Sequence, residues 1–128
     1  MRQLAQVALV VRDYDEARRF YVDQVGFDVL EDSDQGLGRR WLVVGPADGR
    51  GARLLLARAT TPEQQAQVGH QAGGRVWLFL ETDDFAGDHA RMRANGVRFL
   101  EEPRAEPNGT VAVFEDLYGN RWDLIEPR

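Results

Sequence analysis

An internal repeat constrains the fold of this 128-residue chain more than any other feature. The segments Val7–Glu31 and Val76–Glu101 share one order, which is an apolar run, an aspartate, a helix-like stretch, a glycine and a closing Leu-Glu pair. Gly26 of the first copy matches Gly96 of the second, at an offset of 70 residues. Solenoids are built from shorter and more numerous repeats. The repeat therefore predicts one module that has been duplicated.

Each copy of the repeat begins with the signals of a strand followed by a helix. Leu4–Val11 is apolar and rich in valine, which is typical of a buried strand. Asp13 and Glu16 have the spacing of a capping box, so a helix is expected to begin there. Gly26 lies where a left-handed helix end favours glycine. In the second copy, Asp83 or Asp84 is expected to begin the helix.

Further strands are expected at the segments where short apolar runs alternate with glycine-rich turns. These are Phe27–Ser33, Arg39–Val44, Ala52–Arg58, Arg75–Thr82, Val97–Leu100, Thr110–Glu115 and Arg121–Glu126. The predicted fold class is α+β, a single domain over residues 1–128. It contains two βαβββ modules, about 1–59 and 75–128, joined by a linker at 60–74. Their strands would form a curved mixed sheet around a cleft.

Composition excludes several classes of function. Sixteen basic and 21 acidic residues give a net charge of −5, and the basic residues are scattered, which argues against a nucleic-acid-binding or anionic-membrane surface. The chain has no cysteine, so thiol catalysis and thiolate zinc sites are excluded. No apolar run approaches the ~18 residues of a membrane span, and the first residues lack the apolar stretch of a signal peptide. We therefore expect a cytoplasmic protein.

Two motifs resemble those of a known family. The pattern V-x-D-x-x-x-A-x-x-F-Y from Val11 to Tyr21, followed by Gly26-Phe27, is similar to the first-helix signature of the vicinal oxygen chelate superfamily. Residues 115–124, EDLYGNRWDL, are similar to its closing hairpin. This superfamily contains glyoxalase I, extradiol dioxygenases, fosfomycin-resistance enzymes and bleomycin-resistance binding proteins. The resemblance covers essentially the whole chain and implies the paired βαβββ fold, a small-molecule ligand and a homodimer. It leaves function open, because one fold serves both catalysts and binders.

The resemblance also implies where a metal ion would be bound. Metal-dependent members use four strand positions, which fall here on Gln6, near Leu55, on Trp77 and on Asp123. Only the amide of Gln6 and the carboxylate of Asp123 are plausible ligands, since leucine and indole donate nothing to a metal. The shared metal centre is therefore expected to be lost.

Aromatic residues suggest a different kind of site. Period-two alternation places Trp77, Phe79 and Glu81 on one strand face, which is expected to line the cleft. Trp41 and Phe114, from the third strands of the two modules, are expected to contribute. Rings in this arrangement suit flat, conjugated ligands.

Charged and ionisable side chains add further candidates. Glu81 is a candidate partner for a cationic group of a ligand, and if buried it would require a cation such as Arg39 or Arg40. His89 is expected to pack at the edge of the interface between helix and sheet. His70 is either a solvated residue of the linker or part of a segment that folds over the ligand.

Two function classes remain open. The first is a metal-free protein that sequesters an aromatic or polycyclic compound, with Gln6, Trp41, Trp77, Phe79, Glu81, Phe114 and Asp123 as candidate ligand-binding residues. The alternative is a divalent-metal lyase, isomerase or extradiol-type dioxygenase that acts on a small oxygen-rich substrate. It would bind Fe, Mn, Ni or Zn through Gln6 and Asp123, with Glu81 or His70 supplying the missing donors. The sequence favours binding, because two of the four ligand positions are apolar.

Overall fold

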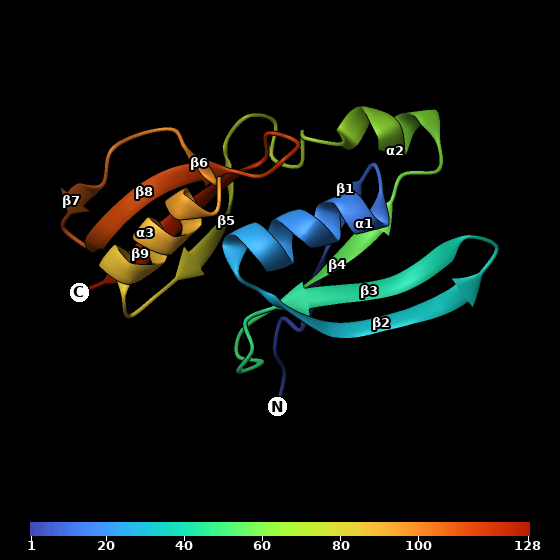
Figure 1. Ribbon diagram of the computed structural model, residues 1–128, viewed down its shortest axis with the longest axis horizontal. Helices are drawn as coiled ribbons and strands as arrows, with labels where there is room; N and C mark the ends of the chain where they lie inside the picture. The colour runs from blue at the N-terminus through green and yellow to red at the C-terminus, as the bar shows by residue number, and fades with distance from the viewer. The chain divides into compact units, whose positions relative to one another are not determined.

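The repeat in the sequence corresponds to two units, Met1–Val68 and Gly69–Arg128, in the computed structural model, which describes all 128 residues. Each unit contains a mixed sheet with a helix packed on one face, as Figure 1 shows for α1 and α3. The α+β fold class and the two βαβββ modules are therefore confirmed. The boundary between the units lies inside the segment 60–74 that was expected to be a linker. This segment contains a short helix, α2 (Pro62–Gln67).

The first unit forms a four-stranded sheet in the order β1-β4-β3-β2. Its elements are β1 (Gln6–Val11), α1 (Tyr14–Arg18), the π-helical segment η1 (Arg19–Val25), β2 (Asp28–Gly36), β3 (Arg39–Gly45) and β4 (Arg53–Arg58). Strands β1 and β4 are parallel and the other pairs are antiparallel.

The helix of the first unit begins and ends as the sequence predicts. The Asp13 carboxylate accepts a hydrogen bond from the Glu16 amide at 2.8 Å, and this satisfies one of the free N–H groups of the first turn. Gly26 ends η1 in the left-handed conformation, with φ of 98°, which a residue with a Cβ adopts only at a cost. Ala17, Phe20 and Tyr21 are buried against the sheet.

Each face of the first sheet has a distinct character. The covered face packs under α1, and its buried side chains are Leu9, Val11, Leu42, Val44, Leu54 and Leu56. We call the opposite side, which no helix of the unit covers, the first open face. By the register of the strands it carries Gln6, Ala8, Val10, Glu31, Ser33, Trp41, Val43, Arg53, Leu55 and Ala57.

The second unit repeats the strand order of the first, as β5-β9-β8-β6, with β7 paired to β8. Its elements are β5 (Val76–Glu81), α3 (Phe85–Ala94), β6 (Arg98–Phe99), β7 (Arg104–Glu106), β8 (Gly109–Glu115) and β9 (Arg121–Pro127). Asp84 begins α3, because its side chain accepts a hydrogen bond from the Gly87 amide. Strand β7 lies where the sequence indicated only a loop.

A row of rings fills the covered face of the second sheet, under α3. His89 of α3 packs on Phe99 with ring centroids 4.3 Å apart. Phe99 contacts Phe114 at 5.6 Å, and Phe114 stacks on Trp122 at 5.8 Å. The opposite side, which no helix of this unit covers, is the second open face. By the register of the strands it carries Phe79, Glu81, Arg98, Arg104, Glu106, Val111, Val113, Glu115, Arg121, Asp123 and Ile125.

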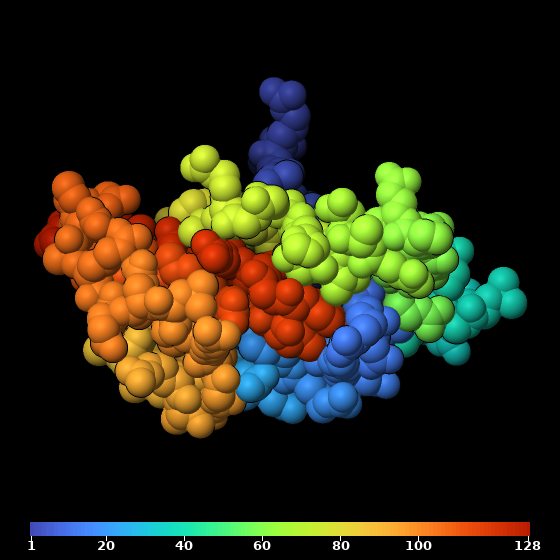
Figure 2. Space-filling view, turned by 90° about the horizontal axis from the view of Figure 1, so that it is seen from above, coloured from blue at the N-terminus to red at the C-terminus, as the bar shows by residue number.

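Two segments of the first unit project from its body. Figure 2 shows the first residues of the chain (dark blue) and the tip of the β2–β3 hairpin (teal) standing clear of the rest of the unit. Met1 and Leu37 are fully exposed accordingly. None of the helices has the length and apolar character that crossing a membrane requires.

Candidate functional site

The second open face holds an exposed ring beside a carboxylate that lacks a partner. Phe79 is 63% exposed, far more than any other phenylalanine of the sheet. It is paired in register with Asp123 of β9, and Val113 of β8 is the partner of Asp123 on the other side. One carboxylate oxygen of Asp123, Oδ1, is buried and accepts no hydrogen bond. Buried polar atoms without a partner are rare in folded proteins, and each one indicates an unmet interaction.

Burial raises the pKa of Asp123, because its carboxylate is taken out of water between two apolar neighbours. Arg104 lowers this pKa and Glu101 raises it, each to a smaller extent than burial. Arg104 is itself held by Glu101 at 2.7 Å and by Glu106. These two carboxylates largely compensate the charge of Arg104. Oδ1 of Asp123 therefore still lacks a hydrogen-bond donor.

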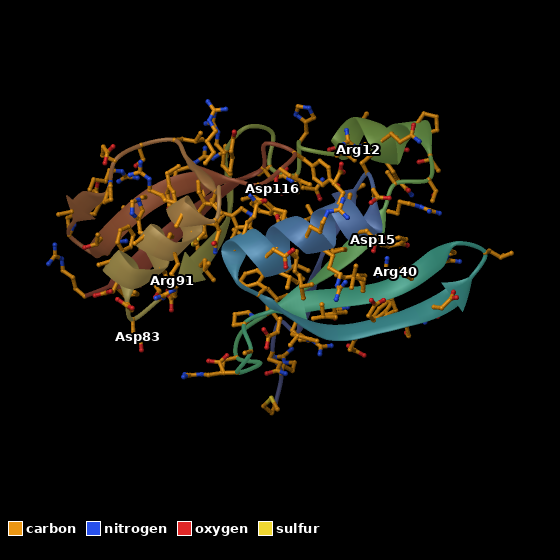
Figure 3. All side chains as sticks on the ribbon, in the orientation of Figure 1. Arg12, Asp15, Arg40, Asp83, Arg91 and Asp116 are labelled. Carbon is orange, nitrogen blue, oxygen red and sulfur yellow. The ribbon has the colours of Figure 1, made fainter.

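Glu81 is exposed and follows Phe79 by two residues on the same strand face. It forms no ion pair within the second unit. A cationic partner such as Arg39 or Arg40 was expected only for a buried Glu81, and the exposed side chain does not require one. Arg40 of β3 is bound by Asp15 of α1 at 2.7 Å and by Asp32 of β2 at 2.9 Å, and Figure 3 shows Arg40 and Asp15 close together. These two carboxylates raise the pKa of Arg40, which stays charged.

A polar row crosses one end of the first open face. Arg53 donates from Nη2 to Oε1 of Gln6 at 3.3 Å and to Oε2 of Glu31 at 2.6 Å. Gly45 of β3 lies between these strands, and a Cβ at this position would meet a Leu30 methyl at 3.1 Å. The missing side chain leaves room for Leu30.

The rest of the first open face is apolar. Trp41 is 39% exposed, and Val43 and Leu55 are register partners beside it on the same face. The neighbouring strand contributes Ala57, a small side chain. This arrangement leaves the indole of Trp41 accessible to a flat ligand.

The side chains at the four family metal positions do not fit a metal ion. In the first unit, the amide oxygen of Gln6 is engaged by the Arg53 guanidinium, a cation that would repel an ion placed there. Leu55 has no donor atom. In the second unit, Asp123 is flanked by Phe79 and Val113, neither of which can ligate. Neither unit gathers three or more His, Asp or Glu side chains that could hold an ion.

Two of the expected ligand-binding rings lie elsewhere. A shift in the β5–β9 register between Val76 and Leu78 takes Trp77 out of the regular alternation, and its ring packs edge-on against Trp122 at 6.0 Å. Phe114 is 0% exposed and belongs to the row of rings under α3. The structure thus brings Phe79 together with Asp123. Trp77 and Phe114 pack against other rings and do not belong to the candidate site.

The two histidines have different surroundings. His89 stacks on Phe85 at 5.5 Å and contacts Phe99, which confirms its expected place between helix and sheet. Burial lowers the pKa of His89, and the charge of Arg93 lowers it further. His70 is exposed. No second metal donor gathers with either histidine within its unit.

Arg53 is the site residue that sequence reasoning missed. Leu55 is the residue of β4 that the resemblance places at a metal position, and it lies on the open face. Period-two alternation puts Arg53 on that same face, so the signal was present in the sequence. Its contact with Gln6 depends on the parallel pairing of β1 and β4, which joins residues far apart in the chain.

A surface hollow at the β2–β3 hairpin is lined by Asp32, Asp34 and residues 36–40. Its charged groups already satisfy one another, since Arg40 is paired with Asp32. The hollow contains no exposed ring, and we do not assign it a ligand.

Comparison with known proteins places this geometry in a family. A family model described as the Glyoxalase/Bleomycin resistance protein/Dioxygenase superfamily matches residues 3–124. An uncharacterized protein of Shewanella frigidimarina is 53% identical over 126 residues, which cover 98% of this chain and 93% of that protein.

Two solved structures are similar over almost their whole length. UcmS2 has 34% sequence identity and a TM-score of 0.83, and the match covers 98% of both chains. TnmS3, an antibiotic binding protein from Streptomyces sp. CB03234, has 33% identity and a TM-score of 0.79, over 100% of this chain and 98% of that one.

Proposed function

Since this chain belongs to the glyoxalase/bleomycin resistance protein/dioxygenase superfamily, we propose that it is a small-molecule-binding protein that sequesters an aromatic or polycyclic ligand without a metal ion. The family by itself leaves catalysis and binding open. The observation that carries the proposal is the exposed ring of Phe79 beside the unpartnered oxygen of Asp123. An exposed ring of this size offers a surface on which a flat ligand can stack.

The first open face supports the same function. Trp41 presents an accessible indole above Val43, Leu55 and Ala57, and Gln6 lies on the same face. Ligand sites are mostly apolar, with a few polar groups that fix orientation. Each unit therefore offers one exposed ring with polar side chains on the same face. The similarity to TnmS3, described as an antibiotic binding protein, is consistent with a ligand of this kind.

The metal-enzyme alternative has weaker support. It requires Gln6 and Asp123 as ligands, with Glu81 or His70 as further donors. The Arg53 guanidinium already binds the Gln6 amide oxygen. The neighbours of Asp123 across the sheet are carbon side chains.

Quenching of tryptophan fluorescence by flat polycyclic compounds tests the proposal, since the chain has three tryptophans. The protein is first treated with EDTA and desalted, so that any binding observed is independent of metal. We expect saturable quenching that is weakened in Phe79→Ala and in Trp41→Ala. A binding curve that appears only after Mn(II), Ni(II), Zn(II) or Fe(II) is added back would favour the metal enzyme.

Assembly is a separate question, and the family resemblance leads us to expect a homodimer. Light scattering coupled to size-exclusion chromatography measures the mass directly. A mass of twice 14.5 kDa is expected, and a monomeric mass would refute this part of the proposal.

A further inference from the structure

The geometry points to a ligand that carries a positive charge next to its ring system, held between the carboxylates of Asp123 and Glu81 with the ring on Phe79. This inference rests on the proposed function and narrows its ligand class. It concerns the second open face only. Three residues carry it, and all three lie on β5 and β9.

The positions of these residues follow from the register of the two strands. Asp123 is the direct partner of Phe79 across the parallel pair, so their backbones are about 5 Å apart. Glu81 lies on the same face as Phe79, about 7 Å further along β5. The Phe79 ring therefore has one carboxylate beside it across the sheet and another along its own strand. Glutamate and aspartate side chains at this separation are long enough to contact one ammonium or ring nitrogen together.

Neither carboxylate is neutralised by the cations of its own unit. Arg104, whose charge lowers the pKa of Asp123, is itself bound by Glu101 and Glu106. Glu81 forms no salt bridge in its unit. Some other acids of this unit are paired, as Glu115 is with Arg98 at 3.1 Å and Asp88 is with Arg91. Phe79 therefore has two carboxylates beside it that form no salt bridge in this unit, on a face that also carries the exposed Arg121 two residues before Asp123.

A cation meets the needs of all three side chains at once. It donates a charge-assisted hydrogen bond to Oδ1 of Asp123, which has no other partner. Such a bond is stronger for a partly buried carboxylate than for an exposed one, because the surroundings screen the charges less. The cation is attracted by Glu81 through the same charge. Its ring is favoured on the face of Phe79, because the π-system of an aromatic ring attracts positive charge. An anionic ligand would be repelled by both acids, and a neutral ring would gain no attraction from either charge.

The test compares two tricyclic compounds of the same shape in EDTA-treated protein at neutral pH. The probes are 9-aminoacridine, which is a cation, and acridone, which is uncharged. Dissociation constants are measured by fluorescence for the wild type and for Asp123→Asn, Glu81→Gln and Asp83→Asn. Asp83 is the matched control, because it is an exposed acid of the same unit outside the open face, and its substitution changes the net charge equally.

We expect 9-aminoacridine to bind about tenfold more tightly than acridone, a difference that is lost in Asp123→Asn, reduced in Glu81→Gln and kept in Asp83→Asn. Equal affinities for the two probes in the wild type would overturn the inference while the proposed ring-binding function stands. Equal effects of Asp83→Asn and Asp123→Asn would also overturn it, since net charge alone would then explain the preference. If neither probe binds, the proposed function fails for tricyclic rings, and this inference fails with it.

Discussion

Alanine substitutions at Phe79 and Phe114 test the different roles of the two faces of the second sheet. Phe79→Ala removes a ring from the open face, and Phe114→Ala removes one from the covered face. Phe79 is 63% exposed and Phe114 is 0% exposed. We expect the first substitution to act mainly on ligand binding and the second mainly on stability. The two variants form a matched pair.

The expected magnitudes follow from the buried area. A fully enclosed phenylalanine side chain buries ~150–250 Å² of surface. Phe79 is 63% exposed, so it buries little more than a third of this area. At about 25 cal/mol per Å² this amounts to roughly 2 kcal/mol, of which alanine keeps a part. We therefore expect Phe79→Ala to lower the free energy of unfolding by about 1 kcal/mol. Phe114→Ala leaves a cavity among Phe99 and Trp122 and should cost about 3–5 kcal/mol.

The assay is urea unfolding followed by tryptophan fluorescence and circular dichroism. The Phe79 variant should unfold at nearly the wild-type urea concentration, and the Phe114 variant at a much lower one. A loss of 3 kcal/mol or more in Phe79→Ala would show that this ring is part of the core, and the description of the open face would be wrong.

The remaining predictions concern charge and backbone conformation. Asp123→Asn should stabilise the protein at pH 7: the folded state binds its proton more tightly than the unfolded chain, so stability falls as pH rises through the raised pKa of Asp123. The gain over wild type should shrink as the pH falls through this raised pKa and vanish below about pH 4. The pKa of His89 is lowered in the folded state, so protonation of this residue favours unfolding, whereas protonation of a salt-bridged histidine favours folding. Wild type should therefore lose stability as pH falls below about 6.5, and His89→Phe should lose less, as chemical denaturation at pH 5 and 7.5 would reveal. Gly26→Ala should cost about 1 kcal/mol in urea unfolding because of its positive φ, whereas Gly26→Asn should cost less. Arg53→Met should change the free energy of unfolding by no more than about 1 kcal/mol, since its ion pair is partly exposed; a larger loss would mean that the pair is buried.

Much of the fold could be predicted because the local signals agree with the tertiary structure. Asp13 begins the first helix and Gly26 ends it, as their residue types indicate. Strand β3 begins at the expected residue, Arg39, and ends one residue later than expected. The repeat also predicts the same strand order in both units, because equal sequence patterns form equal supersecondary structures.

The features that were missed depend on contacts that a sequence pattern does not encode. Strand β7 contains charged residues and is stabilised by its pairing with β8, so it gives no apolar alternation. A register shift beside Trp77 turns its ring towards Trp122, and such an irregularity leaves no signal in the residues themselves. Phe114 lies in a continuous apolar run, in which neighbouring positions do not reveal which face is covered.

The site could be predicted in part. Phe79 and Asp123 were both expected to contact a ligand, and the structure places them side by side in register. The unpartnered oxygen of Asp123 was beyond the reach of the sequence, because it depends on which donors surround the carboxylate in space. The same holds for Arg53, whose contact with Gln6 requires the parallel pairing of β1 with β4.

Chemical-shift mapping of the EDTA-treated, ¹⁵N-labelled protein with 9-aminoacridine tests the central claim most directly. The account predicts saturable shifts at the amides of Phe79, Glu81 and Asp123, without any metal ion, and little change at Met92 of α3 on the covered side. Shifts that are absent until a divalent ion is added, or that are confined to the β2–β3 hairpin, would contradict it.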